Sequence, residues 1–564
     1  MSAIDTASRP RRWPLFASLA GYRLGFLSHD LVAGLTLAAI AIPEQMATSR
    51  LGGFAPEIGF YAFVAGALAF AAFGGNRFLS CGADSTITPI FAGVLATLAA
   101  AGAPDLATLA VALALMVGVV LVLGGLFRLG WIADLLSIPV TTGFLAGIAA
   151  HIVVSQLPEI LGLPAPGGSM LQKLFAIAAA LGATNPYALA IGLGVLAVIM
   201  ISERTDARIP GALIGLAAAS LAVVGLGLEA RGVAVIGALS VAKPTLVVPD
   251  VSFSQALHLV PLALIVAVVT MVQTAATTRS FPSDPETPPD VNRDFVGVGA
   301  GSILAGLFGA FPVDASPPRT AIVAETGGRS QLAGLIAATI VAALLLFGAA
   351  LLRHVPLAAL GGVLLFVAQR IVRVRDIAAV FQQSFGEFLL IVATAAAIIV
   401  LPIEQGVAIG IVLSLLHGIF TVTRARVTVY ERVPGTTIWW PANPHVPGER
   451  VGDVLVVGFQ APLSFLNAYD FRHDCLALLQ ACSPKPRLLV IEATGIVEID
   501  FTAAGVLRDI IKSCRADGVD VAVARLESTR AQEAVTRFGI AALLGDDHLT
   551  RSVEEAVRGL EPKR

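Results

Sequence analysis

The stretch FPVDASPPRTAIVAET, residues 311–326, decides the fold, because it places an Asp, two prolines and an Arg among long apolar segments. Pro317 and Pro318 lack amide hydrogens, so a helix accepts them only in its first turn. The spacing predicts a short helix over 317–326 with Ser316 as its N-cap. At ~1.5 Å per residue, such a helix covers about half of a ~30 Å hydrocarbon core.

A helix this short inside a membrane protein leaves backbone N–H groups free near the midplane of the bilayer. Together with the positive end of the helix dipole, these groups attract an anion. Arg319 adds a full positive charge within the first turn. We therefore predict an anion site at the start of this helix; the alternative is a re-entrant loop with a structural Arg.

The composition indicates a polytopic membrane protein with a soluble appendage. Of 564 residues, 56% are hydrophobic and 13% are charged, a balance that does not suit a soluble protein of this size. The formal net charge of -2 gives no basic field, so no nucleic-acid partner is expected. The four cysteines form no CxxC pair, which favours a reducing cytosol without a disulfide framework. No catalytic, metal or cofactor motif stands out, so neither an enzyme nor a cofactor is expected.

Apolar runs predict fourteen membrane spans, seven in each half of the membrane part. Arginines gather in the loops after even-numbered spans, which places the N-terminus and the tail in the cytoplasm by the positive-inside rule. We expect a cytoplasmic N-terminal arm over 1–30 and a transmembrane domain over 31–424. A weaker amphipathic piece lies near 169–183. The spans are predicted near 31–50, 56–74, 83–101, 106–128, 132–153, 185–202, 209–227, 254–280, 294–310, 317–326, 331–352, 355–373, 386–402 and 404–423.

The third span of each half has an unusual start. Residues 76–92 read NRFLSCGADSTITPIFA, and residues 308–322 read FGAFPVDASPPRTAI. Both contain Asp, then Ser, then Thr, where a helix begins. Two half-helices pointing at one another from inverted repeats would bring two positive dipole ends to one site.

The tail changes character after about residue 424. Residues 425–450 are Pro-rich and are predicted to be a linker. Three strand patterns follow, at 454–460, 487–493 and 519–526, and helical patterns lie near 467–482, 502–515, 528–538 and 549–560. Strands that alternate with helices predict a small α/β domain over 451–564.

The sequence resembles the SulP anion permeases, called solute carrier family 26 in animals, and its tail resembles their STAS domain. The order and spacing of several motifs carry this resemblance over nearly the whole chain. They are AIPEQMATSRLGG with a following GFYAF (41–63), GADSTITPI (82–90), DVNRDFVGVGAGSILAGLFGAFPV (290–313), SPPRTAI (316–322), APLSFLNA (461–468) and IEATGIVEIDFTAAGVL (491–507).

The resemblance implies an architecture and a place for the substrate. It implies a fourteen-span inverted repeat with core and gate domains, a cytosolic STAS domain, elevator-like alternating access and a homodimer. The anion would lie between the third and tenth spans, facing the first and eighth. The positions that this implies for substrate binding are Glu44, Gln45, Ala83, Asp84, Ser85, Gln273, Ser316, Arg319 and Thr320.

The sequence departs from the family pattern at several matching positions, and the usual Gly-Pro-Thr of the third span reads Gly82-Ala83-Asp84. Glu44 stands where many relatives have Gln, and Gln273 stands where many have an acid. Pro318 replaces a common Ser. The architecture of the site is therefore kept, while its side-chain chemistry is rearranged.

The roles of the acidic residues stay open at this stage. Glu44 is either a protonatable group beside the anion or a carboxyl held by Arg50 or Arg319, since a charge in mid-membrane needs a partner or water. Asp84 either serves the site or caps its helix. In the STAS part, Thr502 follows Asp500 in a loop that can carry a phosphorylated hydroxyl, but capping of the next helix is the favoured role.

The features together predict a secondary active transporter of small inorganic or carboxylate anions, such as sulfate or bicarbonate. We place it in a bacterial-type cytoplasmic membrane, with protons as a second partner taken up through Glu44 or Asp84. One alternative is a nucleobase permease of the same fold, which would lack the STAS tail and the Arg of the tenth span. The other is a non-transporting anion sensor that signals through the tail.

Overall fold

The computed structural model describes residues 15–19, 22–100, 104–135, 137–206, 209–237, 246–284, 286, 288–446 and 448–560. It divides into two compact units, Met1–Leu415 and Leu416–Arg564. Most of the predicted cytoplasmic arm over 1–30, including residues 1–14, lies outside the described residues. The last four residues of the predicted domain over 451–564 also lie outside them.

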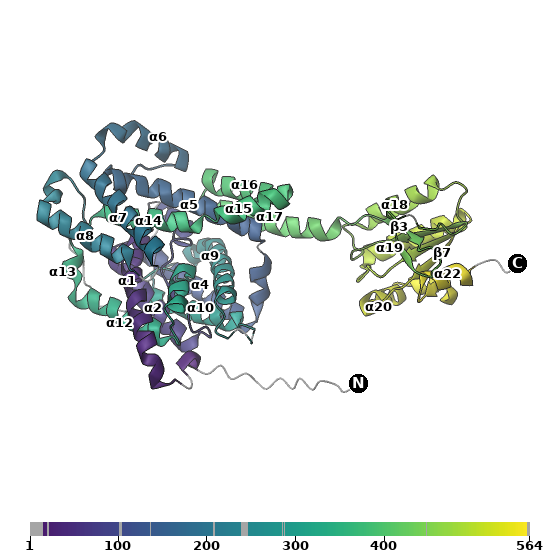
Figure 1. The fold of residues 1–564 in the computed structure, drawn as a ribbon, viewed down its shortest axis with the longest axis horizontal. Helices are drawn as coiled ribbons and strands as arrows, with labels where there is room; N and C mark the ends of the chain where they lie inside the picture. Colours follow the sequence, from purple (N-terminus) through teal and green to yellow (C-terminus); the bar gives the residue numbers. More distant parts are fainter. Residues whose placement is uncertain are drawn as a thin grey trace. The chain divides into compact units, whose positions relative to one another are not determined.

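The first unit is helical (Figure 1), and each predicted apolar segment contains one principal helix. In chain order these are α1 (Leu27–Leu51), α2 (Pro56–Phe73), α3 (Thr88–Ala100), α4 (Leu106–Leu126), α5 (Ile138–Leu161), α7 (Pro186–Thr205), α8 (Gly211–Leu226), α9 (Phe253–Ser280), α10 (Val291–Leu307), α11 (Pro317–Glu325), α12 (Leu332–Phe347), α14 (Leu357–Ile371), α16 (Phe385–Val400) and α17 (Ile403–Thr423).

Three further helices lie beside these segments. The helix α6 (Met170–Ala180) confirms the predicted amphipathic piece. The short helix α13 (Ala349–Leu352) follows α12 within the predicted span 331–352, whereas α15 (Val374–Gln383), which follows α14, was not predicted. The start of the predicted span 132–153 is a 3₁₀ segment, and α5 begins only at Ile138.

The lengths of the helices support a multi-pass membrane protein. Within the described residues, eight helices are long and apolar enough to cross a membrane by length and composition. Five shorter apolar helices, among them α3, α8 and α12, add to these. The number of fourteen crossings stays a prediction, because several of its segments are shorter than a full span.

Two short antiparallel strands hold the two half-helices together. The strands are β1 (Cys81–Gly82) and β2 (Asp314–Ala315), and Gly82 pairs with Asp314. The Ser316 N–H also donates to the Ser80 carbonyl (2.9 Å). Because α3 and α11 follow these strands, the predicted meeting of two helix starts is confirmed. Ser316 is the N-cap residue of α11, but its side chain makes no capping hydrogen bond.

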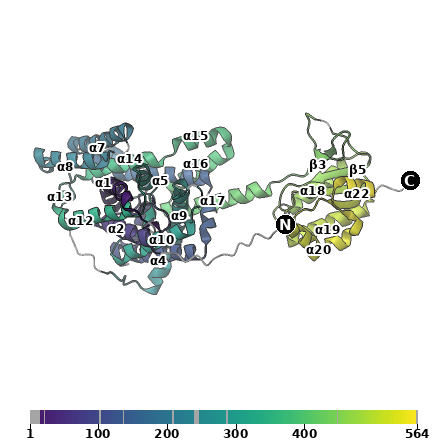
Figure 2. The same ribbon diagram turned by 60° about the horizontal axis from the view of Figure 1, so that its bottom comes forward.

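Glycines let the helices of the first unit approach closely. The helices α4 and α10 lie side by side in both views (Figures 1 and 2). A Cβ atom on Gly125 of α4 would lie 2.4 Å from the Asn292 carbonyl oxygen of α10. A Cβ atom on Gly194 of α7 would have no heavy atom within 4 Å.

We expect Gly125→Ala to destabilise the membrane unit by about 1–3 kcal/mol, because the two backbones must move apart to admit one methyl group. Gly194→Ala is the matched control, and its added methyl group meets open space. Thermal unfolding of the two purified variants in detergent checks this expectation. Equal melting temperatures would show that α4 and α10 are not packed as described.

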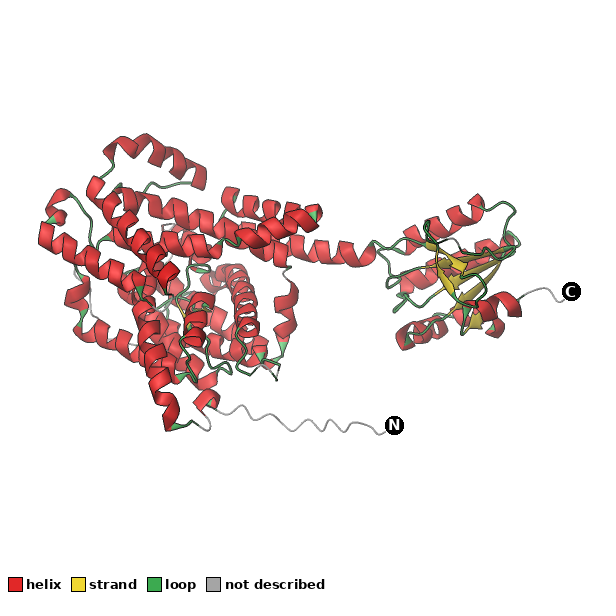
Figure 3. Cartoon of the chain, in the orientation of Figure 1, coloured by secondary structure: helices red, strands yellow, loops and turns green. Residues whose placement is uncertain are grey.

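The second unit is an α/β sandwich with helices on both faces of a six-stranded sheet (Figure 3). The sheet order is β4-β3-β5-β6-β7-β8. The strands β5 (Val454–Gly458), β6 (Leu488–Glu492) and β7 (Asp520–Ala524) confirm the three predicted strands and run parallel. The sequence prediction missed β8 (Leu549–Thr550) at the edge. The helices are α18 (Ala468–Ala481), α19 (Phe501–Ala516), α20 (Thr529–Arg537), α21 (Ile540–Leu544) and α22 (Val553–Gly559).

The prediction of residues 425–450 as a linker is wrong in part, because they contain two strands of the sheet. These are β3 (Thr428–Arg432) and β4 (Trp439–Pro441), and β3 pairs antiparallel with β5. Tyr430 and Trp439 pack into one hydrophobic core of the sheet, against α22 residues. Pro434 and Pro444 fall in turns and Pro441 ends the edge strand β4, where a missing N–H is tolerated.

The STAS-type loop also differs from the prediction in one detail. Asp500, not Thr502, is the N-cap of α19, and its carboxylate accepts a hydrogen bond from the Ala503 N–H (2.8 Å). Asp500 also accepts from the Phe465 N–H (2.7 Å). Thr502 lies exposed in the first turn of α19.

We expect a fragment of residues 424–560 to be more stable than one of residues 451–560 by at least about 3 kcal/mol. The shorter fragment loses two nearly buried aromatic side chains, each worth about 1.5–3 kcal/mol, and exposes an edge of β5. Urea unfolding of both fragments measures the difference. Trp439→Ala should strongly lower the free energy of unfolding of the longer fragment. The neighbouring Trp440, which is 65% exposed, is the control, and Trp440→Ala should change that free energy little. Equal stability of the two fragments would contradict the role given to β3 and β4.

Candidate functional site

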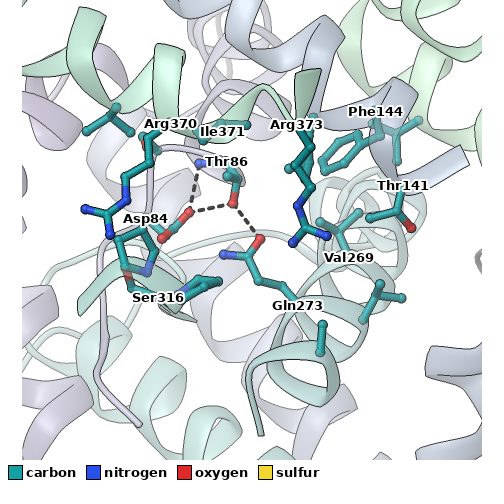
Figure 4. A pocket seen from close by; sticks show the side chains of 18 of the residues that line it. Asp84, Thr86, Thr141, Phe144, Val269, Gln273, Ser316, Arg370, Ile371 and Arg373 are labelled. Atoms are coloured by element: carbon teal, nitrogen blue, oxygen red, sulfur yellow. Dashed lines mark hydrogen bonds between the residues drawn. The ribbon is translucent and has the colours of Figure 1, made fainter. Parts of the chain in front are cut away.

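A cavity in the membrane unit has one polar wall and one apolar wall. Its polar lining includes Glu44 of α1, Asp84, Ser85 and Thr86 before α3, Gln273 of α9 and Ser316 before α11. The rest of the lining is mostly apolar and comes largely from α5, α14 and α17, with Thr141 of α5 and Thr394 of α16 as polar members; its apolar residues include Val140, Phe144, Val367, Ile371, Val407 and Ile411. Figure 4 shows Asp84, Thr86, Gln273 and Ser316 grouped together, with Arg370 and Arg373 on either side.

Arg319 lies behind the polar wall and is completely buried. Its Nη1 donates to a Glu44 carboxylate oxygen (3.0 Å) and to the Ala83 carbonyl (3.1 Å). Its Nε and Nη2 are buried and have no hydrogen-bond partner within the described residues. A guanidinium has five N–H donors, and buried donors are rarely left unpaired. Two of the three guanidinium nitrogens are thus left without an acceptor among the described residues.

The contact between Arg319 and Glu44 answers one open question. Arg50, the other proposed partner of Glu44, instead lies 3.7 Å from Glu159. Glu44 is therefore paired with Arg319 and not with Arg50, and whether it also takes up protons stays a prediction. The carboxylate also lines the cavity, so the ion pair stands at the boundary between the cavity and the buried guanidinium.

Gln45 and Ala83 bind each other and are not among the residues that line the cavity. The Gln45 Nε2 donates to the Ala83 carbonyl (2.9 Å), and the Ala83 N–H donates to the Gln45 Oε1 (2.9 Å). This reciprocal pair satisfies the backbone between β1 and α3. Both residues were predicted to bind substrate; their geometry here gives them a supporting position.

Thr320 has a similar supporting position in the first turn of α11. Its hydroxyl donates to the Ser316 carbonyl (2.7 Å) and accepts from the Ser80 N–H (3.1 Å). The Ser316 hydroxyl, in contrast, is buried and finds no partner in the described part of the chain. Ser316 therefore offers an unused polar group at the cavity wall, and Thr320 does not.

A chain of polar contacts runs across the cavity wall from Asp84 (Figure 4). The Thr86 hydroxyl contacts both the Asp84 Oδ1 and the Gln273 Oε1, the latter at 2.8 Å. The Gln273 Nε2 donates to the Ala315 carbonyl (3.0 Å). The chain thus connects the start of α3, the middle of α9 and the strand before α11. The sequence prediction missed Thr86, although it stands in the quoted motif GADSTITPI.

Arg370 and Arg373 were also missed as cavity residues. The sequence suggested only two cytoplasmic loop charges, yet both side chains line the cavity. Arg370 pairs with Glu203 (3.1 Å), and Arg373 pairs with Asp376 (3.9 Å). Both pairs are about half exposed, so the two arginines add positive potential near the cavity without being buried in it.

Comparison with known proteins identifies the family of this chain. The model of the sulfate permease family matches residues 27–394. The chain belongs to the sulfate permease family. The STAS domain model matches residues 446–556 of the tail. This family consists of transporters, so the protein is a multi-pass membrane transporter of anions and not an enzyme.

The relatives of this chain cover almost its full length. The "Probable sulfate transporter Rv1739c" of Mycobacterium tuberculosis is 32% identical over 95% of this chain and 96% of its own. The "Sulfate transporter 4.1, chloroplastic" of Arabidopsis thaliana is 23% identical over 97% of this chain and 82% of its own.

Solved structures confirm the fold of the permease. The murine Solute Carrier 26 family member A9, in the inward-facing state, matches with a TM-score of 0.88 at 21% identity. The match covers 96% of this chain and 93% of that chain. The transmembrane domain of the cyanobacterial bicarbonate transporter BicA matches with a TM-score of 0.61 at 24% identity, over 70% of this chain and 98% of that one. At these identities the likeness establishes the fold alone.

We expect Arg319→Ala to weaken the binding of sulfate at least about tenfold, the scale of one hydrogen bond to a charged group. The single variant also leaves the Glu44 carboxylate buried without its cation, which can destabilise the protein. The double variant Arg319→Ala/Glu44→Gln avoids this, because it removes both charges of the pair.

Titration calorimetry with sulfate on the purified permease in detergent measures the effect. Arg319→Lys should recover only part of the affinity, because an ammonium lacks the planar fork of the guanidinium. Arg50→Ala, at an exposed ion pair, is the control. Wild-type affinity in a folded double variant would exclude Arg319 from the binding site.

Proposed function

We propose that this permease is a secondary active transporter that moves a small oxyanion, such as sulfate, together with protons across a bacterial-type cytoplasmic membrane. The observation that carries the proposal is the buried Arg319 at the start of a half-helix. Its unused donors lie behind a cavity wall that carries Glu44 and Asp84. The sulfate transporters among the relatives support this substrate class.

The two walls of the cavity support alternating access of the elevator type. Most of the polar groups lie on α1, α9 and the segments before α3 and α11, whereas the lining from α5, α14 and α17 is mostly apolar apart from Thr141 and Arg370. An apolar wall offers few hydrogen bonds to break when the polar part slides along it. We propose that the first group of helices carries the anion and that the second stays fixed. A homodimer with cytoplasmic STAS domains completes the proposed assembly.

The charges around the site support coupling to protons. Three carboxyl groups, Glu44, Asp84 and Asp314, interact electrostatically with one another or with Arg319. If all are ionised, these three carboxylates and Arg319 have a net charge of -2 beside the place of the anion, and Arg370 and Arg373, each paired with an acid, leave that sum unchanged. An entering anion is repelled by this excess, and protonation of a carboxyl relieves the repulsion. By linkage, a proton and an anion then favour each other's binding.

Two features count against the alternative functions. A nucleobase permease of the same fold needs no Arg at the start of α11 and carries no STAS tail. A sensor would not need a cavity whose polar and apolar walls belong to different groups of helices. The alternatives nevertheless make different predictions in liposomes, so one assay separates them.

We expect proteoliposomes with the wild-type permease to accumulate labelled sulfate above its equilibrium level when the external pH is below the internal pH. Uptake should rise as the external pH falls, because external protons are co-substrates. Bicarbonate, chloride, fumarate and uracil complete the panel. Uptake of uracil alone would favour the nucleobase permease, and binding of sulfate without any uptake would favour the sensor. Equilibration of sulfate without accumulation would contradict proton coupling.

A further inference from the structure

The series of polar contacts from Asp84 through Thr86 and Gln273 to Ala315 lacks one hydrogen atom for its hydrogen bonds if Asp84 is ionised. The Thr86 hydroxyl has one hydrogen to donate, yet it lies against two acceptors, the Asp84 Oδ1 and the Gln273 Oε1. The Gln273 Nε2 donates to the Ala315 carbonyl and not to Thr86. One of the two contacts at the Thr86 hydroxyl is then a contact between two oxygens without a hydrogen between them.

Turning the Gln273 amide does not remove the conflict. Oxygen and nitrogen of an amide are assigned from their hydrogen bonds, so both orientations deserve a test. In the turned orientation, the nitrogen faces the Thr86 hydroxyl, and that hydroxyl can donate to Asp84. The amide oxygen then faces the Ala315 carbonyl at the 3.0 Å separation now held by the nitrogen. Either orientation leaves one pair of facing acceptors when Asp84 is ionised.

One proton on Asp84 satisfies every contact. The protonated carboxyl donates to the Thr86 hydroxyl, the hydroxyl donates to the Gln273 Oε1, and the Gln273 Nε2 donates to the Ala315 carbonyl. The Asp84 Oδ1 keeps a lone pair for the Thr86 N–H, at 2.9 Å. Asp84 lines the cavity, so its carboxyl can exchange this proton with the cavity.

The surrounding charges distinguish Asp84 from Glu44. Glu44 already has a cation, because Arg319 donates to it at 3.0 Å. Asp84 forms no ion pair within the residues that the structure describes. The charged groups that face Asp84 are Glu44 from α1, Arg319 from α11, Asp314 from β2, and Arg370 and Arg373 at the cavity wall; Cys81 of β1 is a further titratable neighbour.

We propose that Asp84 is the residue that binds the transported proton, and that Thr86 and Gln273 convert its protonation into a hydrogen bond between α9 and the strand before α11. This inference rests on the proposed proton-coupled transport. When Asp84 loses its proton, Thr86 donates to the carboxylate, the Gln273 amide turns, and the bond to Ala315 breaks. Because Ala315 directly precedes Ser316 at the start of the half-helix, the proton on Asp84 sets the position of the anion site. Glu44 serves instead as the resident counter-charge of Arg319.

The number of protons taken up with the anion tests the assignment. Sulfate is titrated into the purified full-length permease in detergent, near neutral pH, in two buffers that differ in ionisation enthalpy. The wild-type protein should take up protons as sulfate binds. Asp84→Asn should take up none, because an amide binds no proton in this pH range. Glu44→Gln, the matched change at the other cavity carboxyl, should still take up protons.

Proton uptake by Asp84→Asn, or its loss only in Glu44→Gln, would overturn the assignment. Failure of the proposed function has a different signature: the wild-type protein itself would take up no proton or would accumulate no sulfate under a pH gradient. If Asp84→Asn does not fold, Thr86→Val gives the second test, since it keeps the shape and removes the acceptor of the Asp84 proton. It should move the pH midpoint of sulfate affinity up, because the removed hydroxyl bonds the ionised carboxylate more strongly than the protonated one, and an unchanged midpoint would also overturn the proposal.

An infrared measurement gives a readout that a merely structural role would not change. The carbonyl band of a protonated carboxyl group should appear in the pH difference spectrum of the wild-type protein and be absent from that of Asp84→Asn. The band should be retained in Glu44→Gln. A band that disappears only in Glu44→Gln would assign the proton to Glu44 and contradict the chain described here.

Discussion

A guanidinium without access to water is the constraint on which the membrane unit depends. Arg319 is completely buried, and a charge at this depth of a membrane protein requires a counter-charge, hydrogen-bond acceptors or a water-filled cavity. The structure supplies a carboxylate from α1 and a backbone carbonyl from the loop before α3. The three segments that meet at Arg319 come from distant parts of the sequence, so the ion pair fixes how the two halves of the membrane unit face each other.

The same region solves a second problem, the satisfaction of irregular backbone within the membrane. Backbone that leaves the helical conformation in the hydrocarbon region must find its hydrogen bonds inside the protein. Here β1 and β2 bond each other, and the Gln45 side chain bonds both backbone groups of Ala83. The side chains of Gln45 and Thr320 therefore hydrogen-bond backbone groups of these irregular segments. The cavity is left with Glu44, Asp84, Ser85, Gln273 and Ser316 as its polar lining from the predicted set.

The sequence predicted those features that depend on local chemistry. Two adjacent prolines and an Arg placed the start of α11 correctly, and apolar runs located the helices. Pairings between distant residues could not be read in the same way. Glu44 and Arg319 lie 275 positions apart, and nothing local distinguishes Arg319 from Arg50 as the partner. The strands β3 and β4 were missed because prolines at their ends masked a short alternating pattern, and Arg370 was missed because a loop arginine has no local sign that it lines a cavity.

Relative to the family pattern, this chain has an acid in α1, Glu44, and an amide in α9, Gln273. These two differences leave the site in its place and change its chemistry. An acid at residue 44 forms an ion pair with Arg319, so the guanidinium is already neutralised before any substrate enters. An amide at residue 273 cannot hold a negative charge, but it can accept from Thr86 and donate to Ala315 at once. Asp84 is then the carboxyl at the cavity wall that forms no ion pair within the described residues. The two differences therefore act together. Glu44 forms the ion pair with Arg319, and Gln273 joins a series of hydrogen bonds in which every contact is satisfied only when Asp84 carries a proton.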